Sequence, residues 1–348
     1  MVKGRFIVNP FAELSLTEHD HVQLQDLANS VIMAHLDKWS IYKSEKMQVE
    51  ERQNIRMYTE RSSSTSSGEL ITGNGLPIIL AVGTLQGQLD DLMHGVMSPT
   101  LESMRIKASY VDDFDGAAVL DTLVEPSLDD PFQTLVLKWM EVDIPLVKNR
   151  DYVPPPANAW VRGNISALAF WQQTGPNTID MWGTAVMDLG GDMIRMVAVP
   201  AMVGAFMSSV KYGFCGQIRK LAWVLEQRYE ESRQRGTPNK TSDCVTCFSP
   251  ISGRKLGDFG KSNNTCKLCF GFVCRACQLV RKMSFVDPDL QLSQRKVTFC
   301  SACVGQVMSL SSTDAARAMM LSKKGHSKVH NSLSSSASTT SSMSSMSM

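Results

Sequence analysis

Eight of the nine cysteines in this 348-residue chain form four C-x-x-C pairs near its C-terminus, and this pattern constrains the fold more than any other feature. The pairs are Cys244 and Cys247, Cys266 and Cys269, Cys274 and Cys277, and Cys300 and Cys303. Two residues between thiolates let both sulfurs of a pair bind one tetrahedral ion, so four pairs predict two metal sites. Because no histidine lies between His94 and His326, the local ligands are all sulfur. Soft thiolates select zinc, with iron–sulfur chemistry as the main competitor.

The same cysteines could instead form a disulfide framework in a secreted protein. A signal peptide would need an apolar segment after Lys3 and Arg5, but Asn9, Pro10 and Glu13 interrupt that segment. We therefore expect a cytoplasmic protein whose cysteines stay reduced and bind two Zn²⁺ ions.

The short gap between the second and third pairs indicates how the pairs combine. Only four residues separate Cys269 from Cys274, and successive pairs that lie so close usually serve different ions. The first pair is then expected to join the third, and the second pair to join the fourth, which is a cross-brace. One zinc would be bound by Cys244, Cys247, Cys274 and Cys277, and the other by Cys266, Cys269, Cys300 and Cys303.

The charge of the chain is unevenly distributed. Its formal net charge of +1 excludes a globally basic nucleic-acid-binding protein, so no nucleic acid partner is expected. Residues 1–239 carry 21 Lys and Arg against 29 Asp and Glu, whereas residues 240–310 carry 10 against 4. This split predicts an acidic and a basic module. A membrane span is not expected, because the longest uncharged apolar-rich stretch, residues 196–210, has 15 residues and a span needs roughly 20.

Hydrophobic periodicity divides the acidic module into three parts. Residues 17–58 are expected to be helical, because apolar side chains recur every three or four positions. Residues 70–199 are expected to be mostly strands, with β-rich residues 194–199 at their end. Pro200 is expected to open a long helix that ends at Gly236.

Several segments of the acidic module resemble START-like lipid-transfer domains, in the divergent form that is fused to zinc fingers. The segments are Val111-Asp-Asp-Phe-Asp-Gly-Ala-Ala-Val-Leu120, Leu137-Lys-Trp139, Asn149-Arg-Asp151 and residues 160–170. The resemblance implies an α+β helix-grip fold, in which a curved antiparallel sheet wraps a long C-terminal helix. It also implies a cavity for a lipid or another apolar small molecule of unknown identity. The methionines that could form an adaptable wall, or could simply be core, are Met193, Met196, Met202 and Met207.

The cysteine spacing resembles a FYVE-type zinc finger. Most FYVE domains recognise phosphatidylinositol 3-phosphate on endosomal membranes through a basic run with two histidines before the second pair. Here that run reads Ser262-Asn263-Asn264-Thr265-Cys266-Lys267, so the finger is degenerate. The residues left to contact a lipid headgroup are Lys261, Lys267, Arg295 and Lys296. Eight thiolates and two zinc ions lower the charge of the finger from +6 to +2, so we expect only weak peripheral binding to an endosomal-type membrane.

The predicted organisation has five parts. They are an N-terminal segment (1–19), a START-like domain (20–235), a linker (236–243), a FYVE-type double-zinc finger (244–307) and a Ser-rich disordered tail (308–348). Nothing in the sequence resembles a catalytic constellation, so we expect no enzyme activity, and Cys215 is expected to be a small buried hydrophobe. Two functions stay open. The first is binding of a lipid or apolar ligand with weak phosphoinositide association. The second is a protein-interaction scaffold, in which the finger is purely structural.

Overall fold

The structure of the chain is a computed structural model that describes twelve stretches of the sequence. These are residues 13–46, 55–59, 76, 78–111, 116–142, 150–151, 161–162, 164–188, 195–236, 243–250, 264–287 and 289–322. The helices are α1 (Glu18–Lys46), α2 (Leu89–Val96), α3 (Leu101–Ala108), α4 (Arg195–Ser208), the 3₁₀ turn η2 (Ser209–Lys211), α5 (Tyr212–Arg235), α6 (Ser301–Ser309) and a helix over residues 312–322. The strands are β1 (Arg56–Thr59), β2 (Ile78–Gln86), β3 (Gly116–Val124), β4 (Leu135–Val142), β5 (Arg150–Asp151), β6 (Val161–Arg162), β7 (Asn164–Gly175), β8 (Thr178–Asp188), β9 (Leu279–Val286) and β10 (Leu292–Phe299).

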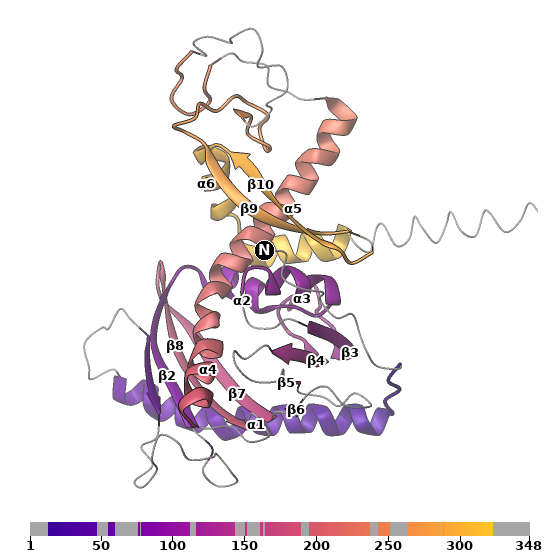
Figure 1. Ribbon diagram of the computed structural model, residues 1–348, viewed down its shortest axis with the longest axis vertical. Helices are drawn as coiled ribbons and strands as arrows, with labels where there is room; N and C mark the ends of the chain where they lie inside the picture. Colours follow the sequence, from indigo (N-terminus) through magenta and orange to yellow (C-terminus); the bar gives the residue numbers. More distant parts are fainter. Residues whose placement is uncertain are drawn as a thin grey trace, which may run out of the picture.

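The first sheet has the strand order β1-β2-β8-β7 and is antiparallel (Figure 1). Alternate residues of its central strands are buried, among them Ile79 and Ala81 of β2 and Met181 of β8. Phe206 of α4 packs against this core. A Cβ atom on Gly183 of β8 would lie 2.6 Å from Cζ of Phe206, so the missing side chain lets α4 lie directly on the sheet.

The second sheet has the order β3-β4-β5-β6, and its β5–β6 pair is parallel. Mixed helix and antiparallel sheet content was predicted and is present, but the single curved sheet was not correct. The described strands of the first 236 residues form two four-stranded sheets. Among the described residues, β2 pairs with β1 and β8, and β3 pairs with β4, so the two sheets share no strand.

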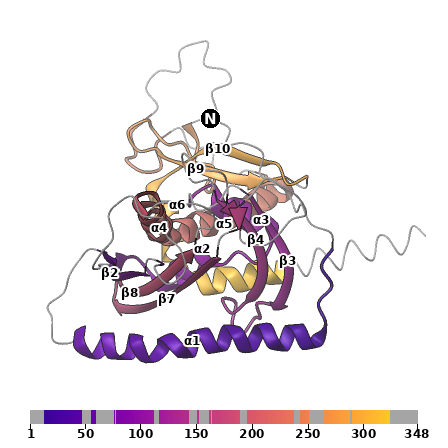
Figure 2. The same ribbon diagram turned by 60° about the horizontal axis from the view of Figure 1, so that its bottom comes forward.

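Helix α1 lies along both sheets (Figure 2). Near its start, His21 Nε2 lies 3.1 Å from Asp121 Oδ2 of β3. Near its end, Trp39 stacks on Phe170 of β7 with ring centroids 5.0 Å apart. The predicted helix over 17–58 is too long, because residues 56–59 form β1, whose backbone pairs with β2 in the first sheet.

The C-terminal helix of the acidic module differs from the prediction at its start. Pro200 lies inside α4, which includes Arg195, so Pro200 does not open the helix and residues 195–199 are not a strand. The helix then passes through η2 into α5.

Helices α2 and α5 cross at two glycines. A Cβ on Gly95 would lie 1.8 Å from the carbonyl oxygen of Tyr212, and a Cβ on Gly216 would lie 1.9 Å from that of Asp91. No side chain fits in either place, so this crossing requires glycine on both helices.

The basic module follows as the hairpin β9–β10, helix α6 and the last helix, and α5 extends alongside it (Figure 1). The prediction that the chain is disordered from residue 308 onward is wrong for the first part of this tail. Residues 312–322 are helical, and Ser312, Ala315 and Ala316 are buried. The Ser-rich residues 331–348 lie outside the described part of the chain, as do residues 237–242 of the predicted linker (236–243).

Candidate metal centres

The eight clustered cysteines come together as two groups of four. The first group, called centre one, contains Cys244, Cys247, Cys274 and Cys277. The second group, called centre two, contains Cys266, Cys269, Cys300 and Cys303. Within each group all Sγ atoms lie within 4.8 Å of one another. Each group contains the same residues as the interleaved pairing expected from the sequence. All nine cysteines are free, so none forms a disulfide.

Two similar turns carry the first cysteine pair of each centre. In centre one, the N–H of Phe248 donates to the carbonyl of Cys244 (2.8 Å), and the N–H of Cys244 donates to the carbonyl of Ser249 (3.0 Å). In centre two, Phe270 N–H donates to Cys266 in the same way (2.9 Å). Both phenylalanines have positive φ, 58° and 59°. A left-handed residue other than glycine costs roughly 1–2 kcal/mol, so each turn requires compensation from the contacts that it makes.

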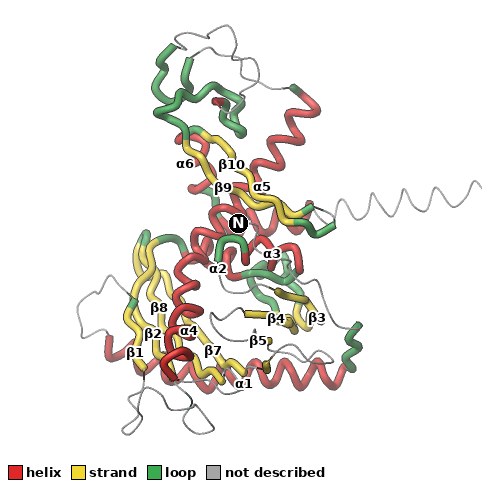
Figure 3. The backbone as a smooth tube through the Cα atoms, viewed as in Figure 1, coloured by secondary structure: helices red, strands yellow, loops and turns green. Residues whose placement is uncertain are grey.

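The other half of each centre is built differently. In centre one it is an isolated turn, in which Cys277 N–H donates to the carbonyl of Cys274 (2.9 Å). In centre two it is the start of α6, where Cys300 is the N-cap and its Sγ accepts from the N–H of Cys303 at 3.4 Å. Figure 3 shows this contrast between loop and helix. The positive end of the α6 dipole favours thiolates at this position.

The sulfur spacing fits a tetrahedral metal ion. Zn–S bonds of about 2.3 Å give a tetrahedron with edges of about 3.8 Å. The Sγ atoms of Cys247 and Cys274 are 3.7 Å apart, and those of Cys269 and Cys300 are 4.0 Å apart. A multinuclear iron–sulfur cluster spreads its cysteines over several irons and needs a wider group. The four-sulfur groups therefore fit a single zinc or a single iron ion.

The protonation chemistry of centre two also favours a cation. Hydrogen bonds from Cys269 and Cys303 hold the pKa of Cys266 far below its ordinary value. The bond to Cys266 in turn raises the pKa of Cys269 to about 11, and it raises that of Cys303 even further. One thiolate therefore forms easily, while the neighbouring thiols resist ionisation. Four thiolates can share this space only if a cation offsets their charge.

The cysteines of centre one also have shifted pKa values. Burial raises the pKa of Cys244, but N–H donors, among them Cys274, outweigh that effect and bring it to about 6. Hydrogen bonds to the thiols of Cys274 and Cys247 raise the pKa of Cys277 to about 12. This centre too needs a cation to ionise fully.

The two centres differ in burial. Cys266 and Cys300 of centre two are 0% and 2% exposed and belong to the core of the basic module, together with Phe299 and Val307. In centre one, Cys244 is also fully buried in this core, but Cys247 is exposed, and the neighbouring Phe248 is 79% exposed. Centre one is therefore open to solvent on the side of Cys247, whereas no cysteine of centre two is exposed.

That core includes residues of the acidic module, because Ile218 and Leu221 of α5 pack in it. A buried ion pair strengthens the connection: Lys220 Nζ lies 2.8 Å from Asp91 Oδ1, with 1% and 3% of the side chains exposed. Lys220 also donates to the carbonyl of Leu310 (2.7 Å), and the Ser312 hydroxyl donates to the Asp91 carboxylate. This ion pair joins α2, α5 and the segment after α6.

The hairpin makes a second contact with the acidic module. The N–H of Ser284 in β9 donates to the Tyr110 hydroxyl (2.6 Å), and the Ser284 and Ser109 hydroxyls are 2.6 Å apart. On the last helix, Arg317 donates to the carbonyls of Leu128 (2.8 Å) and Asp129 (3.3 Å). Sequence reasoning did not find these contacts, since each joins residues far apart in the chain.

The described ones among the predicted lipid-headgroup residues do not all lie on one face of the hairpin. Lys261 lies outside the described residues. Arg295 and Lys296 are adjacent on β10, so their side chains point to opposite faces of the hairpin. Arg295 lies over the Phe285 ring, 5.9 Å from its centroid, whereas Lys296 is directly opposite Lys282. The N–H of Lys267 donates to the Thr298 carbonyl (3.0 Å), which places Lys267 beside β10. Lys282 is the basic neighbour that the sequence did not indicate.

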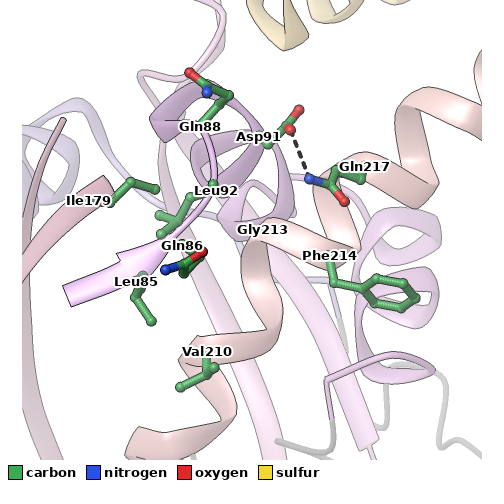
Figure 4. A pocket seen from close by; sticks show the side chains of 11 residues that line it. Leu85, Gln86, Gln88, Asp91, Leu92, Ile179, Val210, Gly213, Phe214 and Gln217 are labelled. Atoms are coloured by element: carbon green, nitrogen blue, oxygen red, sulfur yellow. Dashed lines mark hydrogen bonds between the residues drawn. The ribbon is translucent and has the colours of Figure 1, made fainter. Parts of the chain in front are cut away.

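A pocket of about 200 Å³ lies between the first sheet, α2 and the start of α5 (Figure 4). Its apolar wall includes Leu85, Ile179, Val210 and Phe214, and Gln217 at its end donates to Asp91 Oδ2 (3.2 Å). Of the four methionines predicted for a cavity wall, Met193 and the side chain of Met196 lie outside the described part of the chain. Met202 and Met207 are not among the lining residues of this pocket; Met202 is buried and Met207 is exposed.

In the described part of the chain, no helix is both long and apolar enough to cross a membrane. Cys215 is fully buried, as expected for a small core residue.

Comparison with known proteins gives only distant similarity. No protein-family model matches the chain. No curated protein matches it. Among solved structures it is similar to human STARD10, with a TM-score of 0.34 and 12% identity over 54% of this chain and 75% of that chain. It is also similar to the human StarD13 (DLC2) lipid transfer and protein localization domain, with a TM-score of 0.31 and 13% identity over 51% and 95%. Such low scores carry no argument about function, and the FYVE-type resemblance stays a prediction.

Proposed function

We propose that the protein binds two zinc ions and acts as a non-enzymatic interaction scaffold, in which the zinc finger is structural. The observation that supports this proposal most strongly is the presence of two four-sulfur groups with Sγ atoms within 4.8 Å. Zinc with four protein ligands has no open position for substrate or water, so it stabilises the fold and does not catalyse a reaction. The core shared with α5 and the buried Asp91–Lys220 pair support a finger that is held rigidly on the acidic module.

Elemental analysis and chelation test this proposal. We expect about two zinc ions per chain, each bound by thiolates, because a structural zinc contributes on the order of 10 kcal/mol or more in finger peptides. A strong chelator should abolish hydrogen-exchange protection in β9 and β10, while the first sheet keeps its protection. A protein that contains no metal contradicts the proposal, and one that contains iron corrects the identity of the ion.

A second candidate function is binding of an apolar ligand, which the pocket beside α5 favours. Its wall of Leu85, Ile179, Val210 and Phe214 is apolar, but its volume of about 200 Å³ is below the usual 300–1,000 Å³ of small-molecule sites. The pocket suits a short apolar group better than a whole lipid. Native mass spectrometry of the purified protein tests this candidate, since a retained lipid would require a larger cavity than the described one.

Weak membrane association remains part of the proposal. Lys282 and Lys296 on one hairpin face supply screened charge, worth about 1 kcal/mol each near an anionic surface. We expect cytoplasmic protein with slight, salt-sensitive binding to endosomal-type membranes. Liposome flotation at physiological salt is the test, and tight binding specific for phosphatidylinositol 3-phosphate would contradict it.

A further inference from the structure

The two centres offer very different access to an oxidant in solution. All eight ligand cysteines are described, and Cys247 of centre one is the exposed one among them. Phe248 beside it is 79% exposed, so the described residues leave this end of the turn open to solvent, although Cys244 at the other end is buried. Centre two has two fully or nearly fully buried cysteines, Cys266 and Cys300, and no exposed one. These two and Cys244 of centre one belong to the core shared with α5. An oxidant that must touch sulfur therefore reaches centre one first.

Centre one also has a second sulfur within reach of the exposed one. Cys247 Sγ lies 3.7 Å from Cys274 Sγ, which belongs to the other pair of the same centre. A disulfide needs a separation of about 2.05 Å, so the two sulfurs have to approach by less than 2 Å once the metal has left. The exposed end of the turn, Cys247 and Phe248, can supply this movement without displacing the buried Cys244. In centre two the corresponding movement would involve Cys300, which is buried in the α5 core.

We infer that centre one is an oxidant-sensitive zinc site, in which Cys247 and Cys274 form a disulfide and zinc is released while centre two keeps its ion. This inference rests on the proposed zinc binding and adds a modification site to it. The oxidant is a peroxide, for which hydrogen peroxide serves as the probe.

The two thiolates lose two electrons and form one S–S bond. Hydrogen peroxide accepts those electrons, its O–O bond breaks, and two protons from solvent complete two water molecules. Zn²⁺ leaves, because two thiolates remain where four had held it. A thiol reductant and added zinc restore the original centre.

The consequence is a local change in the finger. The bond from Val245 N–H to the Phe272 carbonyl (2.9 Å) and the donation from Cys274 N–H to Cys244 Sγ (3.3 Å) both join the two halves of centre one. Loss of zinc frees this end to rearrange. The hairpin, α6 and the contacts to α2 are held by centre two and by the buried ion pair, so they stay in place.

The experiment uses the full chain loaded with zinc. Hydrogen peroxide is added in small excess, zinc release is followed with a colorimetric chelator, and disulfides are mapped by alkylation and mass spectrometry. We expect release of about one zinc ion per chain and a Cys247–Cys274 disulfide. Simultaneous release of both ions, or a disulfide within centre two, overturns the inference. A chain that contains no zinc before oxidation instead contradicts the proposed function, so the two failures are distinguishable.

Two matched variants sharpen the result. Cys247→His keeps a nitrogen ligand for zinc but removes the reactive sulfur, so we expect zinc to be retained in peroxide. Cys269→His makes the same change in centre two, and its zinc release should equal that of the unmodified protein. Zinc content is measured in both variants before oxidation. If the Cys247→His variant does not load, the disulfide map of the unmodified chain still decides the question.

Discussion

Centre one and centre two begin with the same turn but end in different surroundings. Each turn places a phenylalanine with positive φ directly after its second cysteine and repeats the same backbone hydrogen bond. Centre two then adds the N-terminus of α6 and has two cysteines in the core that contains Ile218 and Leu221. Centre one has only Cys244 in that core, and its Cys247 is exposed. The comparison teaches that metal geometry is encoded locally in the C-x-x-C-F turn. How firmly each centre is held depends on residues far away in the sequence.

The largest effect is expected from removing a ligand of centre two. Cys300→Ser takes away a buried thiolate at the start of α6, and the loss of a structural zinc costs on the order of 10 kcal/mol in finger peptides. We expect the finger to lose its structure and α5 to lose the cover over Leu221. Zinc analysis together with hydrogen exchange of β10 measures this.

Cys247→Ser is the matched change in centre one and should remove one ion only. The hairpin should keep its exchange protection, because centre two still holds it. If Cys247→Ser also emptied centre two, the difference that we draw between the centres would be wrong.

The next effect concerns the buried ion pair that ties the centre-two side of the finger to α2. Asp91→Asn leaves Lys220 buried without a charged partner, which costs about 3–5 kcal/mol. Urea unfolding of the zinc-loaded protein should show this loss, and the exchange protection of residues 312–322 should fall. Asp90→Asn serves as the control: Asp90 accepts from the N–H of Ser312 at 2.7 Å, and the amide oxygen of asparagine can keep this bond, so the loss should stay below about 1 kcal/mol. Equal losses in the two variants would show that the buried pair contributes no more than the removal of a neighbouring carboxylate charge.

A smaller effect is expected at the crossing of α2 and α5, which supports the same side of the finger. Gly216→Ala places a methyl group against the Asp91 carbonyl and should cost about 1–3 kcal/mol by overpacking. Gly213→Ala lies one turn earlier on α5, where a Cβ meets nothing within 4 Å. It should stabilise the helix by up to about 1 kcal/mol. Thermal unfolding of the two variants compares them directly, and equal shifts in melting temperature would contradict the close crossing.

The smallest effect concerns pH and the buried His94 on α2. Burial, and then the charges of Arg219 and Lys220, hold the pKa of His94 well below its ordinary value. The unfolded chain therefore binds a proton that the folded chain refuses, so stability is full above the ordinary pKa and falls as the pH drops below it. Between about pH 7.5 and pH 6 this loss is below about 1 kcal/mol.

His94→Leu should flatten the pH dependence in that window. Urea midpoints at the two pH values measure it, with zinc content checked at each. If the urea midpoint of the His94→Leu variant changed with pH as much as that of the unmodified protein, the pH dependence would be assigned to the cysteines instead.

The metal ligands could be predicted from sequence because their chemistry is local. Two residues between cysteines, and four between the second and third pairs, suffice to indicate which sulfurs share an ion. The arrangement of the predicted headgroup residues could not be predicted in the same way. Arg295 and Lys296 face opposite sides of the hairpin, and only the register of β9 and β10 shows that Lys282 lies opposite Lys296.

The sheet organisation and the attachment of the finger could not be read from the sequence. Hydrophobic periodicity indicates where strands lie but not which strands pair with one another. A single sheet was therefore predicted where the described strands form two. Lys220 has no local signal of an ion pair, because Asp91 lies 129 residues away. Pro200 was misplaced because proline is also compatible with a helix interior when other contacts compensate for the lost hydrogen bond.

The sharing of α5 has a consequence for how such a protein could arise by gene fusion. One face of this helix serves a core that exists only when the finger is present, through Ile218, Leu221 and the partly buried Leu225. Recombination at the linker that deleted the finger would uncover these side chains to water. Descendants would then come under selection to replace them with polar residues. Relatives that lack the cysteine pairs are therefore expected to differ at these three helix positions, whereas the glycine at position 216 should persist in both lineages.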